Sequence, residues 1–183
     1  MAGSSLPSMA PGTLVCTTFL LLCLSAIMGI THTAEVTIKE TNMVFYLQDW
    51  VTGENVTAIP VAGQKPSSTA INFGTIMVID DAVTERPERN STQVGRAQGV
   101  YVNSALDGSD FHLAFSIIFT NEMYKGSTLE IQGADRYLLN PREVSVVSGT
   151  GMFRFARGYA LLETAYFSGL NAIVKFNVTI RQY

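Results

Sequence analysis

The side chains available for chemistry in this chain of 183 residues are mainly carboxylates, arginines and tyrosines. Beyond residue 34 there is no cysteine, and the one histidine is His112. On a strand predicted over residues 111–121, His112 projects away from the apolar face, which favours an exposed or packed histidine. This composition excludes the usual zinc sites and the Ser-His-Asp and Cys-His nucleophile systems. The chemistry that remains is proton transfer to or from oxygen, and we expect neither a metal nor a cofactor.

Asp49 is the carboxylate that the local pattern singles out. Residues 42–50 alternate as a β-strand, and Asp49 falls on the same face as Met43, Phe45 and Leu47. A carboxyl group on an apolar face loses solvation, so its pKa rises and it can donate a proton. The alternative is an aspartate at the end of the strand that caps the following turn.

Residues 149–160 are too aromatic and too well alternated for a helix, and they contain two arginines. We predict a strand here and in the residues that follow, with one face formed by evenly spaced side chains: Phe153, Phe155, Arg157, Tyr159 and Leu161. A cation on a buried face must find a carboxylate or a ligand oxygen. The pattern therefore predicts a β-barrel with a polar group inside an apolar pocket, where function is usually located.

The rest of the chain after residue 35 reads as short strands separated by turns rich in Gly, Pro, Asn and Asp. Residues 81–90 are charged and contain a proline, so we expect an exposed loop, which Asp80 and Asp81 order at its start. About eight antiparallel strands in an all-β domain of this size fit a small closed barrel, with a sandwich as the alternative. The further predicted strands are 56–62, 71–80, 94–103, 111–121, 127–133, 144–147 and 172–182.

The amino-terminal segment predicts entry into the secretory pathway. Residues 13–30 are almost wholly apolar, small residues follow, and the first charged residue is Glu35. We interpret residues 1–34 as a signal peptide, cleaved between about 26 and 34, with one domain over residues 35–183. An uncleaved membrane anchor is the alternative. Cys16 and Cys23 both lie in this segment, so the mature chain would be free of disulfides.

Two further features bear on where the protein acts. The formal net charge of −3 excludes the strongly basic surface of a nucleic-acid-binding protein. Three Asn-X-Ser/Thr triplets follow the apolar segment and predict glycosylation of a secreted protein, at Asn55, Asn90 and Asn177.

Several segments together resemble the plant dirigent proteins. They are FYLQD at 45–49, FGTIMVIDD at 73–81, VGRAQGVY at 94–101, GADRYLLNPREVSVV at 133–147, and residues 149–160. The resemblance spans nearly all of the chain after the apolar segment. It implies an eight-stranded antiparallel barrel of the allene oxide cyclase type and secretion to the apoplast, typically as a homotrimer, with a dimer as the alternative. It also implies binding of phenolic radicals or quinone methides without a redox centre, the radicals being made by a separate oxidase of laccase or peroxidase type.

Carried over to this sequence, the resemblance implies a set of pocket residues. The pocket carboxylates correspond to Asp49 and Asp135, the pocket arginine to Arg142 and the pocket tyrosine to Tyr101. From the residues alone, Asp135 also fits a turn, Arg142 a surface loop and Tyr101 the core. The apolar faces of the predicted strands add two aromatic residues that we expect to contact substrate, Phe115 and Phe176.

One departure from the family pattern affects the expected substrate. The lignan-forming branch usually has a cysteine near each end of the mature chain, and this chain ends at residues 179–183 without one. It therefore resembles the wider branch that includes the pterocarpan synthases. The leading hypothesis is stereoselective coupling of phenoxy radicals, as in lignan-type phenylpropanoid metabolism. The alternatives are a dehydratase acting on an isoflavanol and a non-catalytic barrel that binds phenols or serves wall assembly.

We predict that the mature protein is a glycosylated homo-oligomer without disulfides. Intact mass before and after enzymatic deglycosylation, with light scattering for size, measures both properties. An unglycosylated monomer from plant tissue would contradict the prediction.

Overall fold

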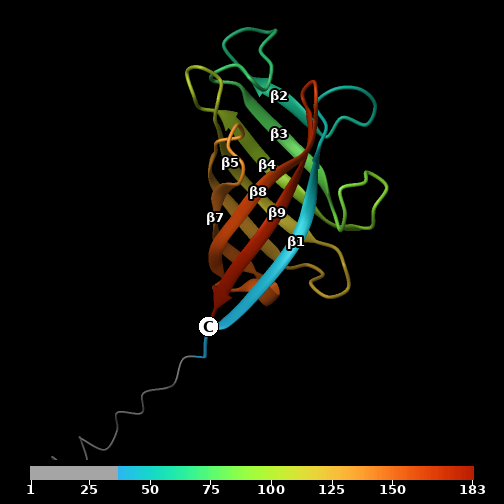
Figure 1. Ribbon diagram of the computed structural model, residues 1–183, viewed down its shortest axis with the longest axis vertical. Helices are drawn as coiled ribbons and strands as arrows, with labels where there is room; N and C mark the ends of the chain where they lie inside the picture. The colour runs from blue at the N-terminus through green and yellow to red at the C-terminus, as the bar shows by residue number, and fades with distance from the viewer. Residues whose placement is uncertain (1–36) are drawn as a thin grey trace, which may run out of the picture. The chain divides into compact units, whose positions relative to one another are not determined.

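The computed structural model describes residues 37–183, which form one antiparallel β-sheet curved into a barrel (Figure 1). One short 3₁₀ helix, η1 (Gly151–Phe153), interrupts the strands, and the described residues contain no α-helix. The strands are β1 (Lys39–Asp49), β2 (Ala58–Ala62), β3 (Ile76–Thr84), β4 (Gln93–Asn103), β5 (Phe111–Phe119), β6 (Thr128–Asp135), β7 (Arg142–Thr150), β8 (Arg157–Ser168) and β9 (Asn171–Gln182).

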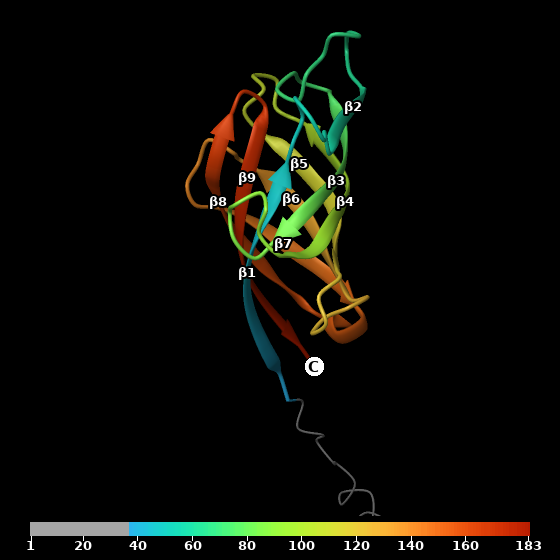
Figure 2. The ribbon, with the colours of Figure 1, turned by 90° about the vertical axis from the view of Figure 1, so that its right-hand side faces the viewer.

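Eight of these strands close the barrel, which confirms the predicted fold class and removes the sandwich alternative. Neighbouring strands follow the order β1-β9-β8-β7-β6-β5-β4-β3. Closure comes from antiparallel pairing of β1 with β3, in which Tyr46 lies opposite Thr84 and Gln48 opposite Ala82. The short strand β2 pairs with the remaining part of β3, at the upper end of the barrel in Figures 1 and 2. We call the β1–β3 pairing the seam.

The barrel interior is filled by the inward-facing residues of the alternating strands. Along β5, Leu113, Phe115, Ile117 and Phe119 are all buried, and His112 is exposed on the other face, as predicted. Aromatic rings pack across the interior, with the rings of Phe45 and Phe176 stacked at 5.4 Å between centroids. Burial of this apolar surface is the main favourable contribution to folding.

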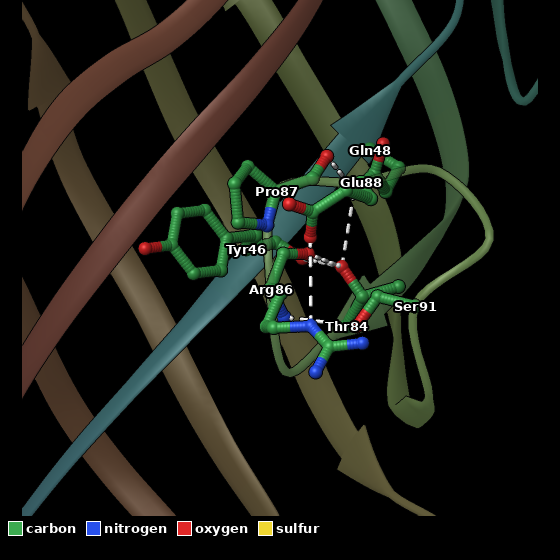
Figure 3. Close-up of polar contacts among 7 residues, drawn as sticks. All are labelled: Tyr46, Gln48, Thr84, Arg86, Pro87, Glu88 and Ser91. Atoms are coloured by element: carbon green, nitrogen blue, oxygen red, sulfur yellow. Dashed lines mark hydrogen bonds and ion pairs between the residues drawn. The ribbon is translucent and has the colours of Figure 1, made fainter.

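A loop over residues 85–92 covers the seam from outside (Figure 3). The buried Gln48 side chain donates hydrogen bonds to Thr84 Oγ1 at 3.0 Å and to the Pro87 carbonyl at 3.2 Å. Thr84 Oγ1 donates to the Arg86 carbonyl at 2.8 Å. The charged loop that we predicted as exposed is therefore partly anchored, because its backbone supplies hydrogen-bond acceptors to the seam.

The prediction of one strand over residues 149–160 was wrong. Strand β7 ends at Thr150, η1 follows, and β8 begins only at Arg157. Gly151 has a φ of 60° and Phe155 a φ of 66°, so the chain turns where an extended strand was expected. Arg157 is exposed and lies on the outer face, hence it is not the inward cation of the barrel.

The boundaries of the strand predicted over residues 71–80 were also wrong. Strand β3 begins at Ile76, whereas Ile71 and Phe73 precede it and are exposed by 48% and 38%. The strand continues through both aspartates to Thr84, and Asp81 is completely buried within it. Asp81 therefore belongs to the barrel interior and does not order a surface loop.

The predicted signal peptide at residues 1–34 lies outside the described residues. Within residues 37–183, no helix is long and apolar enough to cross a membrane.

Because Gln48 on β1 donates across the seam to Thr84 on β3 and to Pro87 in the loop after it, we predict that Gln48→Leu lowers the free energy of unfolding by about 1–3 kcal/mol. Urea denaturation measures the difference. The matched control is Gln132→Leu, at an exposed glutamine on β6, and it should change stability little. Equal stability of the two variants would show that the seam does not depend on Gln48.

Candidate active-site pocket

A pocket in the barrel brings polar side chains together against apolar walls. The apolar walls come from several strands and include Leu47, Ile79, Leu113, Leu162 and Val174, and the polar side chains include Asp49, Asp81, Tyr101, Asp135 and Arg142. These polar residues form two groups, one around the seam and one on the neighbouring strands β6 and β7. The opposite end of the barrel holds buried Phe153, whose ring contacts Phe119 and Tyr124.

The first group is an acid pair created by barrel closure. The seam register places Gln48 opposite Ala82, and one further step along each strand reaches Asp49 and Asp81. Both side chains face the pocket, and both oxygens of Asp81 and the Oδ1 of Asp49 are shielded from solvent. None of these three oxygens has a hydrogen-bond partner among residues 37–183 within normal distance and angle. These oxygens can therefore accept a hydrogen bond or bind a proton, because no residue among 37–183 is hydrogen-bonded to them.

Burial changes the protonation of this pair. It raises the pKa of Asp49 to about 7, and the nearby Tyr101 hydroxyl, as a hydrogen-bond donor, partly opposes the rise. Burial also raises the pKa of Asp81 well above its usual range, and the charge on Asp49 raises it further. Two carboxyl groups this close cannot both ionise cheaply in an apolar interior, so the pair retains a proton at neutral pH.

Tyr101 extends this group from β4. Its side chain is buried, and burial followed by the two carboxylate charges raises the pKa of its phenol above the usual value. The phenol therefore stays neutral and can serve as a hydrogen-bond donor.

The second group is an ion pair between Asp135, at the end of β6, and Arg142, at the start of β7. The Nε of Arg142 donates to Asp135 Oδ1, and its Nη1 donates to Thr164 Oγ1 on β8 at 3.0 Å. The side chains are only 10% and 3% exposed. Burial raises the pKa of Asp135, and the Arg142 guanidinium opposes that rise. A buried pair of this kind fixes the orientation of a charged carboxylate.

Aromatic rings form much of the surrounding wall. The Phe111 ring lies 5.1 Å from that of Tyr101, edge to face, and stacks on Tyr137 at 5.0 Å. Phe115 and Phe176 also line the pocket, with centroids 6.4 Å apart and a near-perpendicular arrangement. Such walls suit flat apolar rings, and the polar groups can fix their orientation.

The structure brings together all six residues predicted for catalysis and substrate binding, since each of them lines this pocket. They are Asp49, Tyr101, Phe115, Asp135, Arg142 and Phe176. The residue that sequence reasoning missed is Asp81. The alternating pattern of the sequence could have identified it, because Met77, Ile79, Asp81 and Val83 lie on one face of the strand.

The three predicted glycosylation sites lie on the surface of the barrel. Asn55 and Asn90 are exposed in loops, and Asn177 is exposed on the outer face of β9. Among residues 37–183 no three His, Cys, Asp or Glu side chains are grouped so that they could hold a metal ion.

Residues 40–181 match the family model described as "Dirigent-like protein". This chain belongs to the dirigent family. Dirigent protein 1 of Arabidopsis thaliana is 42% identical over 143 residues, which cover 78% of this chain and 79% of that protein. Pterocarpan synthase 1 of Glycine max is 34% identical over 147 residues, with 78% and 79% covered.

Solved structures of dirigent proteins share the fold. A pterocarpan synthase dirigent protein superposes with a TM-score of 0.76 at 33% identity, over 81% of this chain and 88% of that one. A second pterocarpan synthase dirigent protein gives a TM-score of 0.75 at 33% identity, over 79% of this chain and 96% of that one. The sequence, the structure and the comparisons therefore agree on an eight-stranded dirigent barrel.

The raised pKa of Asp49 predicts a pH effect on the stability of this dirigent barrel. The folded chain holds this proton more tightly than the unfolded chain, where the pKa is near 3.8. The stabilisation is therefore complete below about pH 4 and is lost as pH rises through about 7. Asp49→Asn removes this titration, so the variant should lose less stability than the wild type between these pH values.

Urea denaturation at a series of pH values measures this effect. Glu85→Gln, at an exposed position in the loop over the seam, is the control and should follow the wild type. Parallel pH profiles for wild type and Asp49→Asn would contradict the assignment of a raised pKa.

Proposed function

We propose that this dirigent protein imposes a stereochemical outcome on the coupling of phenoxy radicals that a separate one-electron oxidase produces. The observation that carries the proposal is the pocket itself, in which aromatic walls surround a carboxyl pair that keeps a proton at neutral pH. Flat phenolic rings fit such walls, and their oxygens fit the two polar groups. The substrates are plant phenols, as the resemblance to the family implies.

The coupling step needs orientation more than chemical activation. Each phenol loses one electron and one proton to the oxidase before it binds. Two bound radicals then form one carbon–carbon bond, with no further electron transfer. By holding each ring against an aromatic wall, the barrel exposes one face of it, and this selects one stereoisomer.

Proton transfer follows the coupling. The coupled product is a quinone methide, which is trapped when a hydroxyl oxygen attacks its benzylic carbon. The quinone methide oxygen then gains a proton, and the attacking hydroxyl loses one. We assign the donor to the Asp49–Asp81 pair, which carries a proton at neutral pH. We assign the acceptor to the Asp135 carboxylate, which Arg142 orients.

A dehydratase is the second candidate function, and the protonated acid pair favours it specifically. A buried acid can protonate a benzylic hydroxyl, which leaves as water while the conjugated phenol gives up its proton, and this forms a quinone methide. An internal phenol then adds to the benzylic carbon and loses its proton, and the quinone methide oxygen regains one. This route consumes no oxidant. The solved pterocarpan synthases that share the fold at 33% identity lend it support.

The expected setting of this activity is the plant apoplast, reached by secretion, with the barrel assembled as a homo-oligomer, by expectation a trimer. The apolar amino-terminal segment and the three surface asparagines in glycosylation triplets support secretion. The resemblance to the dirigent family supports the oligomer.

The requirement for an oxidant distinguishes the two candidate functions. The purified protein is incubated with a panel of plant phenols, with and without a one-electron oxidant, and the products are analysed on a chiral column. Coupling predicts enantiomeric excess only when oxidant is present. Turnover of an isoflavanol by protein alone would establish the dehydratase instead. Racemic coupling products across the panel would remove the coupling role.

We predict that Asp49→Asn, Asp81→Asn and Asp135→Asn keep the fold but lower stereoselective product formation by roughly 10²–10⁴, the contribution of a positioned acid or base. Arg142→Ala should act similarly, because it leaves Asp135 without its partner. Chiral product yield at matched folded fraction is the measurement.

Glu85→Gln and Glu88→Gln are the controls, since both side chains are exposed in the loop over the seam. Both should retain wild-type yield and enantiomeric excess. If the pocket variants match these controls, the carboxyls are structural and the barrel directs the reaction by shape alone.

A further inference from the structure

A cluster of aromatic rings and arginines lies on the outer face of the barrel, where β8 begins and β9 ends. Arg157 on β8 is directly opposite Arg181 on β9, and the Phe155 ring stacks on that of Tyr183 at 5.7 Å with an interplanar angle of 9°. The next outward residue along β8 is Tyr159. We call these five residues the aromatic–arginine patch, and its three rings are exposed by 60%, 76% and 40% for Phe155, Tyr183 and Tyr159.

The backbone at Phe155 holds its ring outward at an energetic cost. Its φ of 66° lies in the left-handed region, which a bulky residue rarely adopts. The fold does not need the ring there, because the neighbouring Phe153 and Ala156 are the buried residues of this turn. A strained backbone that presents an exposed aromatic ring is more typical of a binding surface than of a structural turn.

The patch also contains an arginine without an ion pair among the described residues. Like charges directly opposite each other on antiparallel strands destabilise the pair. Arg181 is compensated by Glu40 at 2.8 Å. Arg157, and Arg154 in the adjacent turn, form no ion pair among residues 37–183. The chain as a whole has a net charge of −3, so this local excess of cations is specific to the patch.

The patch is held as an extended platform. Gln182 Nε2 donates to the Met152 carbonyl at 2.9 Å, which ties the end of β9 to the turn before β8. Arg157 is opposite Arg181 and Tyr159 is opposite Thr179, so the arginine pair lies between Tyr159 and the stacked rings of Phe155 and Tyr183. The patch therefore offers, in order, a stacked aromatic pair, an arginine pair and a single aromatic ring.

We propose that the aromatic–arginine patch binds an acidic polysaccharide whose sugar rings carry carboxylate groups. The apolar C–H face of a pyranose ring packs on an exposed aromatic ring, and a guanidinium pairs with a carboxylate through two parallel hydrogen bonds. The net negative charge of the chain disfavours nucleic acid as the partner. The patch lies on strands and on the turn before β8, with no basic amphipathic helix among residues 37–183, which disfavours a membrane.

Binding to polygalacturonate tests the proposal directly. Protein expressed from the full-length sequence in a plant host is titrated with polygalacturonate by calorimetry, and uncharged dextran serves as the matched polymer. We expect binding to polygalacturonate alone, weakened as sodium chloride is added. The titration is repeated after enzymatic removal of N-glycans, because Asn177 lies on the same outer face of β9. The binding should persist in that sample.

Two variants separate binding from stability. Phe155→Gly relieves the left-handed backbone and Arg157→Gln removes the opposed charges, so neither should lower the melting temperature. Each should weaken polygalacturonate binding by about tenfold, the value of one charge-assisted or stacking contact. Arg86→Gln is the control, at an exposed arginine already paired with Glu88, and it should bind like the wild type.

Other results would overturn the proposal. With the wild type, these are equal binding to dextran or no binding to either polymer. With the variants, wild-type affinity in both would overturn it. So would stronger binding to anionic phospholipid vesicles than to polygalacturonate, or light scattering that shows the patch mediates only self-association. Lower melting temperatures in both variants would show that the patch is structural.

Discussion

The acid pair of Asp49 and Asp81 depends on the way the barrel closes. Two carboxyl groups side by side in an apolar interior cannot both be charged, and that constraint sets the proton content of the pocket. The pair exists because β1 meets β3 at the seam, whose register brings the end of one strand beside the middle of the other. Gln48 and the loop over the seam hold that register from outside. Fold and chemistry are thus coupled at one strand pairing.

The second polar group complements the first. Asp135 and Arg142 come from adjacent strands away from the seam. Their ion pair keeps the Asp135 carboxylate charged, whereas the Asp49–Asp81 pair keeps a proton. A pocket with a proton donor in one group and an oriented carboxylate in the other can move a proton on and off neighbouring oxygens of one substrate. Both candidate functions use this arrangement. They differ in whether an external oxidant prepares the substrate.

How far the site follows from sequence depends on how local its determinants are. Asp49 was predicted from strand alternation alone, because its face is set by neighbours two residues apart. Asp135 and Arg142 needed the family resemblance, since their pairing joins two strands across a turn. Asp81 was missed because its adjacent charged residues suggested a loop, whereas the seam buries it. Arg157 was misplaced because alternation does not reveal the turn at Gly151. Long-range register is the information that a single sequence lacks.

The proton on the acid pair is the central claim, and carbon-13 NMR of the aspartate carboxyl groups measures it most directly. Protein labelled at the aspartate side-chain carboxyl carbons is titrated across the stable pH range, and Asp49→Asn identifies the Asp49 resonance. The account predicts that this resonance titrates with a midpoint near pH 7, with Asp81 titrating at a pH well above that of an ordinary carboxyl. Midpoints near 4 for both groups, the value of a solvated aspartate, would contradict it.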